Sequence, residues 1–311
     1  MKFFLTGATG FVGSRLLGHL VADGISVRAL VREPSDILPA EVGQIIGDLD
    51  SFSGDLVGID VVVHMAARAH MMRDEVVDPL MEYRKINRDS TLALARLAAQ
   101  AKVERFVFVS SIGVNGNQTV TPFSESDETY PHDAYSLSKY EAEQGLLSIA
   151  HETGLEVVII RPPLVYGANA PGNFGSLVKW VKKGVPLPLG LVSNLRSMVA
   201  LDNLVDFILL CADRKRTPKA ANQVFLISDG ADVSTSELLR KVAKACGVKS
   251  RLLPVPVGLM RFAAKVLGKG AVADRLFGNL QLDSSKARDL LGWQPVTTMD
   301  EQLQKMFEDK I

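Results

Sequence analysis

Residues 2–13 read KFFLTGATGFVG, a short apolar run that leads into three glycines, Gly7, Gly10 and Gly13, at spacings of three. A strand that turns through such a loop into a helix leaves free backbone N–H groups and the positive end of the helix dipole at the turn. Glycine permits the tight turn, the close approach of a pyrophosphate and the close packing of helix on strand. The stretch therefore predicts the phosphate-binding turn of a dinucleotide-binding α/β fold.

Apolar, β-branched runs recur through the first half of the chain, and stretches of helical periodicity lie between several of them. Continuous apolar runs are typical of strands buried on both faces, and strands alternating with helices form a parallel sheet. The sequence thus predicts a doubly wound α/β fold. The expected strands are residues 2–5, 26–31, 44–46, 60–64, 105–110 and 156–161, and the expected helices include 11–23, 81–102 and 135–152.

The pattern changes after about residue 165, where Pro, Gly and Asn become dense in YGANAPGNFG (166–175) and GVPLPLGLV (184–192). Short, less regular elements follow, with no flexible linker before them. We expect a dinucleotide-binding domain over residues 1–165, to which a segment at about 197–212 returns. Residues 166–311 are expected to form a smaller α/β region that binds substrate on the carboxyl ends of the strands.

The composition is that of an ordinary soluble enzyme, with 47% hydrophobic and 23% charged residues among 311. Equal numbers of basic and acidic residues, 35 of each, predict no general attraction to nucleic acid or to anionic membranes. Cys211 and Cys246 have no neighbouring histidine cluster, so neither a disulfide framework nor a metal site is expected. The short apolar run at the N-terminus predicts neither a signal peptide nor a stable membrane anchor, and hence a cytoplasmic protein.

One segment qualifies the prediction about membranes. Residues 258–278 read GLMRFAAKVLGKGAVADRLFG, which is both apolar and basic. Such a stretch can lie on a membrane surface, or it can form a helix packed on the domain or on a partner. Gly268 and Gly270 interrupt its apolar face and favour the packed helix.

Tyr135 and Lys139, in YSLSK, are one turn apart on the expected helix and project from the same face. An ammonium close to a phenol favours the phenolate, so we expect Lys139 to lower the pKa of Tyr135 and make it a general acid/base. Ser111 ends a preceding strand, at the edge of the sheet where ligands bind in doubly wound folds. Its hydroxyl could therefore hydrogen-bond the same substrate oxygen.

Three motifs in this order and spacing resemble the extended short-chain dehydrogenase/reductase family of nucleotide-sugar epimerases, dehydratases and reductases. They are TGATGFVG (6–13), VFVSSIGVNG (107–116) and YSLSK (135–139). The resemblance covers nearly the whole chain. Further similar stretches are Asp48-Leu49, VHMAA (63–67), Asn87, RPPLVYG (161–167), and DSSKA (283–287) followed by LGWQP.

The resemblance implies a Rossmann domain that binds NAD or NADP, a nucleotide-sugar substrate and a homodimer formed through the helices at 81–102 and 135–152. It assigns Tyr135 as acid/base, Lys139 to the nicotinamide ribose and Ser111 to the sugar oxygen. The implied cofactor-binding residues are Gly7, Thr9, Gly10, Phe11, Val12, Gly13, Arg32, Asp48, Leu49, Ala66, Ala67, Asn87, Tyr135, Lys139 and Pro162. Substrate contacts, besides Ser111, are expected from Arg196, which matches the family's diphosphate clamp, and from Asn173 and Arg275.

The sequence also allows predictions for three histidines. His64 is expected to be a satisfied residue at the end of a strand and not a ligand. His70 and His132 could line the sugar pocket. No metal site is predicted from any of them.

The residues after two strands narrow the reaction. Ser111 is followed by Ile112-Gly113 instead of the Asp-Glu pair of the family's dehydratases, so dehydration is not expected. Val31 and Arg32 stand where NAD-dependent members usually end the second strand with an aspartate. A carboxylate repels a 2′-phosphate and a guanidinium accommodates it, so NADP(H) is favoured while NAD(H) stays possible.

The sequence therefore favours reduction of a UDP-linked 4-keto sugar, such as a UDP-4-keto-6-deoxy-N-acetylhexosamine, for surface polysaccharide. A UDP-glucose or UDP-N-acetylglucosamine 4-epimerase with tightly bound NAD is the alternative. A non-catalytic dinucleotide-binding structural or sensor protein is a third possibility, against which the presence of Ser111, Tyr135 and Lys139 argues.

Overall fold

Seven parallel strands form the central sheet of the computed structural model, which describes residues 1–68 and 78–308. Their order is β3-β2-β1-β4-β5-β6-β9, so the chain reverses its direction of winding between β1 and β4. Ligands of such sheets bind in the crevice at that point, beyond the carboxyl ends of the strands. The strands are β1 (Lys2–Thr6), β2 (Ser26–Val31), β3 (Gly43–Ile46), β4 (Val61–His64), β5 (Arg105–Val109), β6 (Glu156–Arg161) and β9 (Gln223–Leu226).

The predicted doubly wound parallel sheet is confirmed, and each of the six expected strands lies within one residue of its expected bounds. The seventh strand, β9, was not expected. It comes from the part of the chain predicted to bind substrate and pairs with β6, with Ile160 opposite Phe225. The sheet therefore draws on more of the second half of the chain than the predicted return segment at 197–212.

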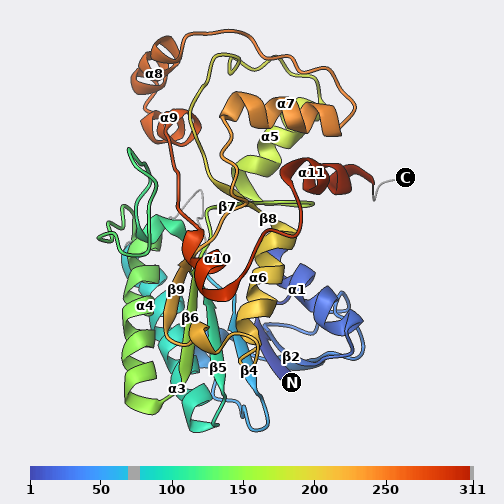
Figure 1. Cartoon of the computed structure of the whole chain (residues 1–311), viewed down its shortest axis with the longest axis vertical. Helices are drawn as coiled ribbons and strands as arrows, with labels where there is room; N and C mark the ends of the chain where they lie inside the picture. The colour runs from blue at the N-terminus through green and yellow to red at the C-terminus, as the bar shows by residue number, and fades with distance from the viewer. Residues whose placement is uncertain (69–77, 309–311) are drawn as a thin grey trace.

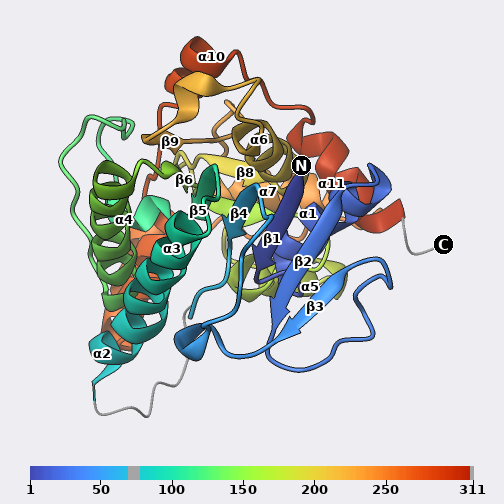
Figure 2. The same cartoon turned by 90° about the horizontal axis from the view of Figure 1, so that it is seen from below.

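Helices cover both faces of the sheet (Figures 1 and 2). On one face α1 (Phe11–Ala22) and α6 (Leu201–Ala212) pack on inward-facing side chains such as Leu5 and Val63. On the other face α3 (Ser90–Gln100) and α4 (Ala134–Thr153) pack on alternate residues such as Phe4. This alternation along fully buried strands explains why the strand sequences read as continuous apolar runs.

The single helix expected over residues 81–102 is interrupted. The chain forms α2 (Pro79–Arg84), a five-residue π-helical turn η2 (Lys85–Asp89) and then α3. Two hydroxyls bond to backbone oxygens in this turn, Ser90 Oγ to Lys85 O and Thr91 Oγ1 to Asn87 O. Such bonds compete with the regular helical pattern, which residue periodicity alone does not reveal.

Much of the rest of the chain lies beyond the carboxyl ends of the strands, in the upper half of Figure 1, whereas α10 (Ser285–Leu291) packs beside β9. A two-stranded parallel sheet, β7 and β8, supports three helices, α5, α7 and α11, around a separate apolar cluster. No helix in residues 1–68 and 78–308 is long and apolar enough to cross a membrane. The remaining elements are β7 (Leu164–Tyr166), β8 (Met198–Ala200), α5 (Gly172–Lys182), α7 (Thr235–Ala245), α8 (Val257–Val266), α9 (Gly270–Phe277), α10 (Ser285–Leu291), α11 (Met299–Glu308), and the short turns η1 (Leu49–Ser51), η3 (Ile112–Val114) and η4 (Pro218–Ala220).

Candidate active site

The glycine loop joins β1 to α1 through contacts that leave no room for a side chain. Gly7 has φ +75°, in the left-handed region, and its oxygen accepts a 3.0 Å hydrogen bond from Gly10 N. A Cβ added at Gly13 would lie 2.0 Å from Gly7 O. Gly10 begins α1 with no side chain capping the helix, so the first turn presents its N–H groups to a ligand.

A cavity of about 540 Å³ lies over this loop, with Thr9, Gly10 and Phe11 in its wall. Its other side is formed by the segment after β7, including Asn169 and Pro171. Free N–H groups, a helix N-terminus and a glycine-lined approach are the features that bind a pyrophosphate. The residues present therefore fit the diphosphate of a dinucleotide.

The loop after β4 forms the opposite wall of the crevice. A Cβ at Gly7 would lie 2.8 Å from the nitrogen of Ala66, so β1 and the β4 loop approach each other through backbone. Ala66 N also donates to Thr6 Oγ1 at 3.2 Å. Ala66 and Ala67 are partly exposed there, as small residues bordering a flat ligand would be.

His64 is buried and satisfied, which confirms the expectation for this residue. Its Nδ1 lies 2.6 Å from Thr6 Oγ1, and its Nε2 lies 2.8 Å from Thr91 Oγ1. Burial lowers the pKa of His64 to about 3, with a smaller contribution from the nearby charge of Lys139. The imidazole is thus a neutral structural link between β1, β4 and the helix that follows.

Ser111 and Tyr135 line one cavity of about 410 Å³ between the central sheet and the second half of the chain. Asp133 caps α4 by accepting from Ser136 N at 2.7 Å, which places Tyr135 in the first turn. Ser111 Oγ accepts from Gly113 N at 3.1 Å. The Tyr135 hydroxyl therefore comes from the start of α4 and the Ser111 hydroxyl from the end of β5, and local hydrogen bonds hold both segments.

The expected lowering of the Tyr135 pKa is wrong. Burial raises the pKa of Tyr135 to about 12, and Asp133 and Tyr83 add to the effect. Lys139 points elsewhere: its Nζ donates to Val109 O at 3.0 Å and lies 4.4 Å from the centre of the Phe108 ring. The phenol is consequently protonated near neutral pH.

Lys139 is itself perturbed. The side chain is only 1% exposed, and burial lowers the pKa of Lys139 to about 7, partly offset by the charge of Glu143. An amine that titrates near neutrality in a crevice is typical of functional sites. Lys139 lies where β5 ends, with its Nζ against the backbone oxygen of Val109.

A buried ion pair lies behind these residues, and sequence reasoning missed it. Arg161 forms a two-pronged contact with Glu143, and its Nη1 donates to Asn115 Oδ1 at 2.9 Å. Glu143 also accepts from Ser110 Oγ. The pair ties α4, the end of β5 and the end of β6 together. Its sequence signal is the spacing of Tyr135, Lys139 and Glu143 at four-residue intervals along α4.

The second half of the chain supplies a cationic wall to the same cavity. Arg196, Arg275 and Asn173, the three residues expected to contact substrate, all line it, and so does His132. Burial lowers the pKa of Arg196, and the neighbouring Arg275 charge lowers it further. Two guanidinium groups within electrostatic reach make this wall attractive to a phosphate.

The adenosine end of the expected site is an open edge of the sheet. Arg32 follows β2 directly and is exposed, and Asp48 is the exposed residue before η1. Val31 O accepts from Gly47 N at 2.9 Å, which holds the two segments together. Leu49 packs against the apolar cluster under α3.

The contacts that the structure shows for the other predicted site residues mainly support the fold. Asn87 is buried and bonds the backbone of Arg68 on both sides of its amide, at 2.8 and 3.1 Å. Pro162 accepts from Ile112 N at 3.0 Å, and Val12 is partly buried in α1. His70 lies outside the described residues. Within the described ranges no cluster of metal-ligating side chains occurs.

Comparison with known proteins agrees with this geometry. The model of the NAD dependent epimerase/dehydratase family matches residues 3–227. A UDP-glucose 4-epimerase of Vibrio cholerae is 46% identical over 307 residues, which cover 96% of this chain and 92% of the relative. An N-acetyl-α-D-glucosaminyl-diphospho-ditrans,octacis-undecaprenol 4-epimerase of Escherichia coli O157:H7 is 31% identical over 265 residues, or 82% and 76% of the two chains.

Solved structures show the same fold over almost the full length. A UDP-glucose 4-epimerase of Thermotoga maritima with UDP-glucose superposes with a TM-score of 0.80 at 23% identity, covering 99% of this chain and 98% of the other. MoeE5 in complex with UDP-glucuronic acid and NAD superposes with a TM-score of 0.79 at 27% identity, with the same coverage.

Proposed function

The chain belongs to the NAD-dependent epimerase/dehydratase family, and from that premise we propose that it is a 4-epimerase of UDP-hexoses or UDP-N-acetylhexosamines. The observation that carries the proposal is the match to the Vibrio cholerae UDP-glucose 4-epimerase, 46% identical over 96% of this chain. Ser111, Tyr135 and the cationic wall of Arg196 and Arg275 share one cavity, as that chemistry requires.

A nicotinamide dinucleotide would be held by the glycine loop and α1 at its diphosphate and by Ala66 and Ala67 along its length. When bound, it supplies hydride transfer to and from C4 of the sugar. The fit rests on the closeness of Gly7 and Gly13 and on the uncapped start of α1. Asn87 supports the loop after β4, which carries Ala66 and Ala67, and Pro162 supports the site through the loop after β6.

In the proposed reaction Tyr135 Oη moves the proton at O4 of the sugar, and Ser111 Oγ hydrogen-bonds the same oxygen. The protonated phenol suits the half-reaction that delivers a proton to O4. The opposite half-reaction needs the phenolate, which a nearby positive charge stabilises. Lys139 would supply that charge only if its ammonium left Val109 O and turned toward Tyr135.

Arg196 and Arg275 are proposed to bind the diphosphate of the substrate, with Asn173 at the same wall. The guanidinium fork matches phosphate oxygens in pairs. Both UDP-sugars and a polyprenyl diphosphate sugar carry this group, so the cationic wall serves either. We propose that residues 166–311, apart from the segments that return to the sheet, form this substrate-binding region.

Tyr135→Phe tests the proposal. Removal of the acid/base should reduce turnover by about 10²–10⁴-fold. Retention of dinucleotide by the purified protein should not change. Tyr140→Phe, on the same helix and also partly buried, is the matched control and should keep full activity. Equal activity of both variants would remove Tyr135 from the reaction.

One observation favours a second candidate, an NADPH-dependent 4-ketoreductase. Arg32 is exposed directly after β2, beside Val31, where a carboxylate would repel a 2′-phosphate. An exchangeable reductant suits a one-way reductase, whereas an epimerase must retain its dinucleotide between the two hydride transfers. Arg32→Ala should weaken NADPH much more than NADH in titrations if this candidate holds, and equal losses would exclude it.

We propose a cytoplasmic homodimer formed through α3 and α4, which lie side by side on one face of the sheet (Figure 2). Its product would enter the biosynthesis of surface polysaccharide. Sedimentation equilibrium would test the dimer.

A further inference from the structure

Helix α8 presents an apolar face that the described part of the chain leaves uncovered. Leu259, Phe262 and Val266 are 60%, 66% and 70% exposed. Their spacing of three and four residues places them on one side of the helix. The opposite side packs, through Val257 and Met260, on the apolar cluster formed around α5, α7 and α11. The helix is thus seated on the protein by one face and offers the other to solvent.

Helix α9 and the turn before it extend this face. Leu267 is 69% and Val272 is 51% exposed. The two helices are held as a pair by Arg261, which forms a 3.0 Å ion pair with Asp274 and lies 5.7 Å from the centre of the Phe277 ring. Soluble monomers rarely expose several large apolar side chains together without a use for them.

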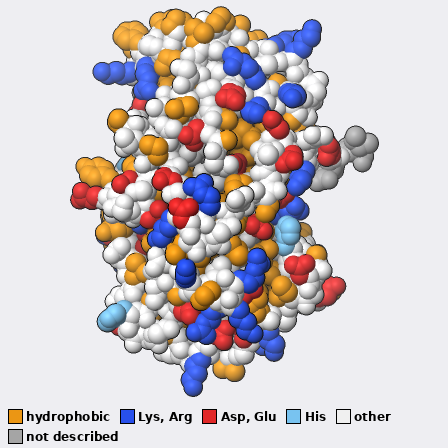
Figure 3. All heavy atoms as spheres, viewed as in Figure 1, with side chains coloured by type: hydrophobic (Ala, Val, Ile, Leu, Met, Phe, Trp, Pro, Cys, Tyr) orange, Lys and Arg blue, Asp and Glu red, His pale blue; other side chains and the backbone are white. Residues whose placement is uncertain are grey.

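The charge of this region departs strongly from that of the whole chain. Residues 248–278 contain six Lys and Arg and only one acidic residue, Asp274, although the full sequence has 35 of each sign. The segment therefore carries a net charge of +5, and the rest of the chain carries −5. Lys265 and Lys269 are exposed next to the apolar face. Figure 3 shows hydrophobic side chains gathered at the upper end of the molecule among Lys and Arg.

We propose that the α8–α9 surface, residues 257–277, binds reversibly to bilayers that contain anionic phospholipid. The apolar side chains enter the boundary between headgroups and acyl chains, and the flanking lysines contact lipid phosphates, as in interfacial amphipathic helices. Charge decides between occupants. Residues 257–277 contain four basic residues and one acidic residue, so a second copy of the chain would bring +3 against +3, whereas an acidic lipid surface is complementary to this charge.

This surface adjoins the candidate active site. Arg275 and Leu276 of α9 also line the cavity that holds Ser111 and Tyr135. Docking of α8 and α9 would therefore keep the cavity close to the bilayer surface. Membrane binding does not depend on the proposed reaction, so a variant inactive in catalysis should still bind.

Cosedimentation of the full-length protein with vesicles tests the proposal. The protein should bind vesicles of phosphatidylcholine and phosphatidylglycerol in equal amounts, and not vesicles of phosphatidylcholine alone. Raising salt from about 0.1 M to about 1 M should release it, because the screening length falls from about 10 Å to about 3 Å. Absence of binding to the mixed vesicles, or equal binding to both kinds, would overturn the proposal.

Substitutions at exposed positions test the apolar part and the basic part of the surface separately, without disturbing the core. Phe262→Ser should weaken binding about tenfold. The double variant Lys265→Gln, Lys269→Gln should weaken it roughly 25-fold, about fivefold for each charge. Ile37→Ser and the pair Lys215→Gln, Lys219→Gln, all exposed elsewhere, are matched controls and should bind as the wild type does. Vesicle binding by Phe262→Ser and by the double lysine variant that equals wild-type binding would contradict the proposal. A wild-type dimer that Phe262→Ser dissociates would also contradict it, because a second copy of the chain would then occupy this surface.

Discussion

At the scale of single residues, the imidazole of His64 couples stability to pH. Its pKa is about 3 in the folded protein, against an ordinary value of 6.5, because burial disfavours the charged form. The unfolded chain therefore binds the proton first as pH falls. The stabilisation is complete above about pH 6.5 and is lost progressively toward pH 3, about 5 kcal/mol in all.

Urea unfolding at pH 7, 6 and 5 measures this coupling. Below about pH 6.5 the unfolding free energy of the wild type should approach a fall of about 1.4 kcal/mol per pH unit from this group. His64→Gln, which can keep bonds to Thr6 and Thr91, should flatten the profile whatever its absolute stability. His151→Gln, at an exposed position, should leave the slope unchanged. The same slope in all three proteins would contradict the assignment.

At the scale of elements, the start of α1 decides whether the phosphate-binding turn can form. A Cβ at Gly13 would meet Gly7 O at 2.0 Å, so Gly13→Ala must displace the turn. We expect a loss of about 1–3 kcal/mol in unfolding free energy. Most of the bound dinucleotide should also be lost.

Gly18, on the same helix, provides the matched control. A Cβ there meets nothing within 4 Å, so Gly18→Ala should stabilise the protein by about 0.5–1 kcal/mol and keep the dinucleotide. Thermal unfolding and the absorbance of dinucleotide released on denaturation distinguish the two variants. Similar behaviour of both would show that the close packing of the loop is not needed for binding.

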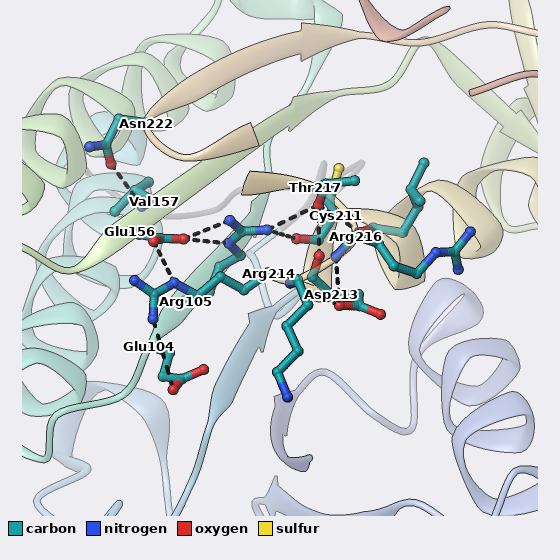
Figure 4. Close-up of polar contacts among 12 residues, drawn as sticks. Glu104, Arg105, Glu156, Val157, Cys211, Asp213, Arg214, Arg216, Thr217 and Asn222 are labelled. Carbon is teal, nitrogen blue, oxygen red and sulfur yellow. Dashed lines mark hydrogen bonds and ion pairs between the residues drawn. The ribbon is translucent and has the colours of Figure 1, made fainter. Parts of the chain in front are cut away.

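At the scale of the whole molecule, a buried arginine joins the sheet to the end of α6, at the end of the sheet opposite the cavity (Figure 4). Arg105, fully buried on β5, binds Glu156 of β6 and donates to Cys211 O and Thr217 Oγ1 at 2.8 and 3.1 Å. Arg214 contacts the other carboxylate oxygen of Glu156. The cluster fastens the end of α6 to the sheet.

Arg105→Met removes the hydrogen bonds to Cys211 O and Thr217 Oγ1, while Glu156 keeps its contact with Arg214. A buried polar group left without its partner costs about 1–3 kcal/mol, and we expect a loss of this size in denaturant unfolding. Arg96→Met breaks an exposed pair with Glu152 and should cause no measurable change. A small effect at Arg105 would mean that the cluster is replaceable by apolar packing.

The sequence predicted the sheet and the helices on it because their periodicity is local. It missed β9, whose four residues follow Asn222, a residue with φ +59°. Asn222 fixes that strand by exchanging hydrogen bonds with Val157, 65 positions away. Likewise the motifs indicated Ser111, Tyr135 and Lys139, but not that burial outweighs the expected effect of Lys139 on the tyrosine pKa. Local sequence patterns do not reveal burial or strand pairing that depends on residues far apart in the chain.

The most direct test of the proposed 4-epimerase is incubation of the purified protein with UDP-glucose, and separately with UDP-N-acetylglucosamine, without added dinucleotide. We expect interconversion with the C4 epimer and no net release of reduced dinucleotide. Failure to form the C4 epimer of either sugar, together with reduction of a UDP-4-keto sugar when it and NADPH are supplied in a parallel incubation, would contradict the proposal.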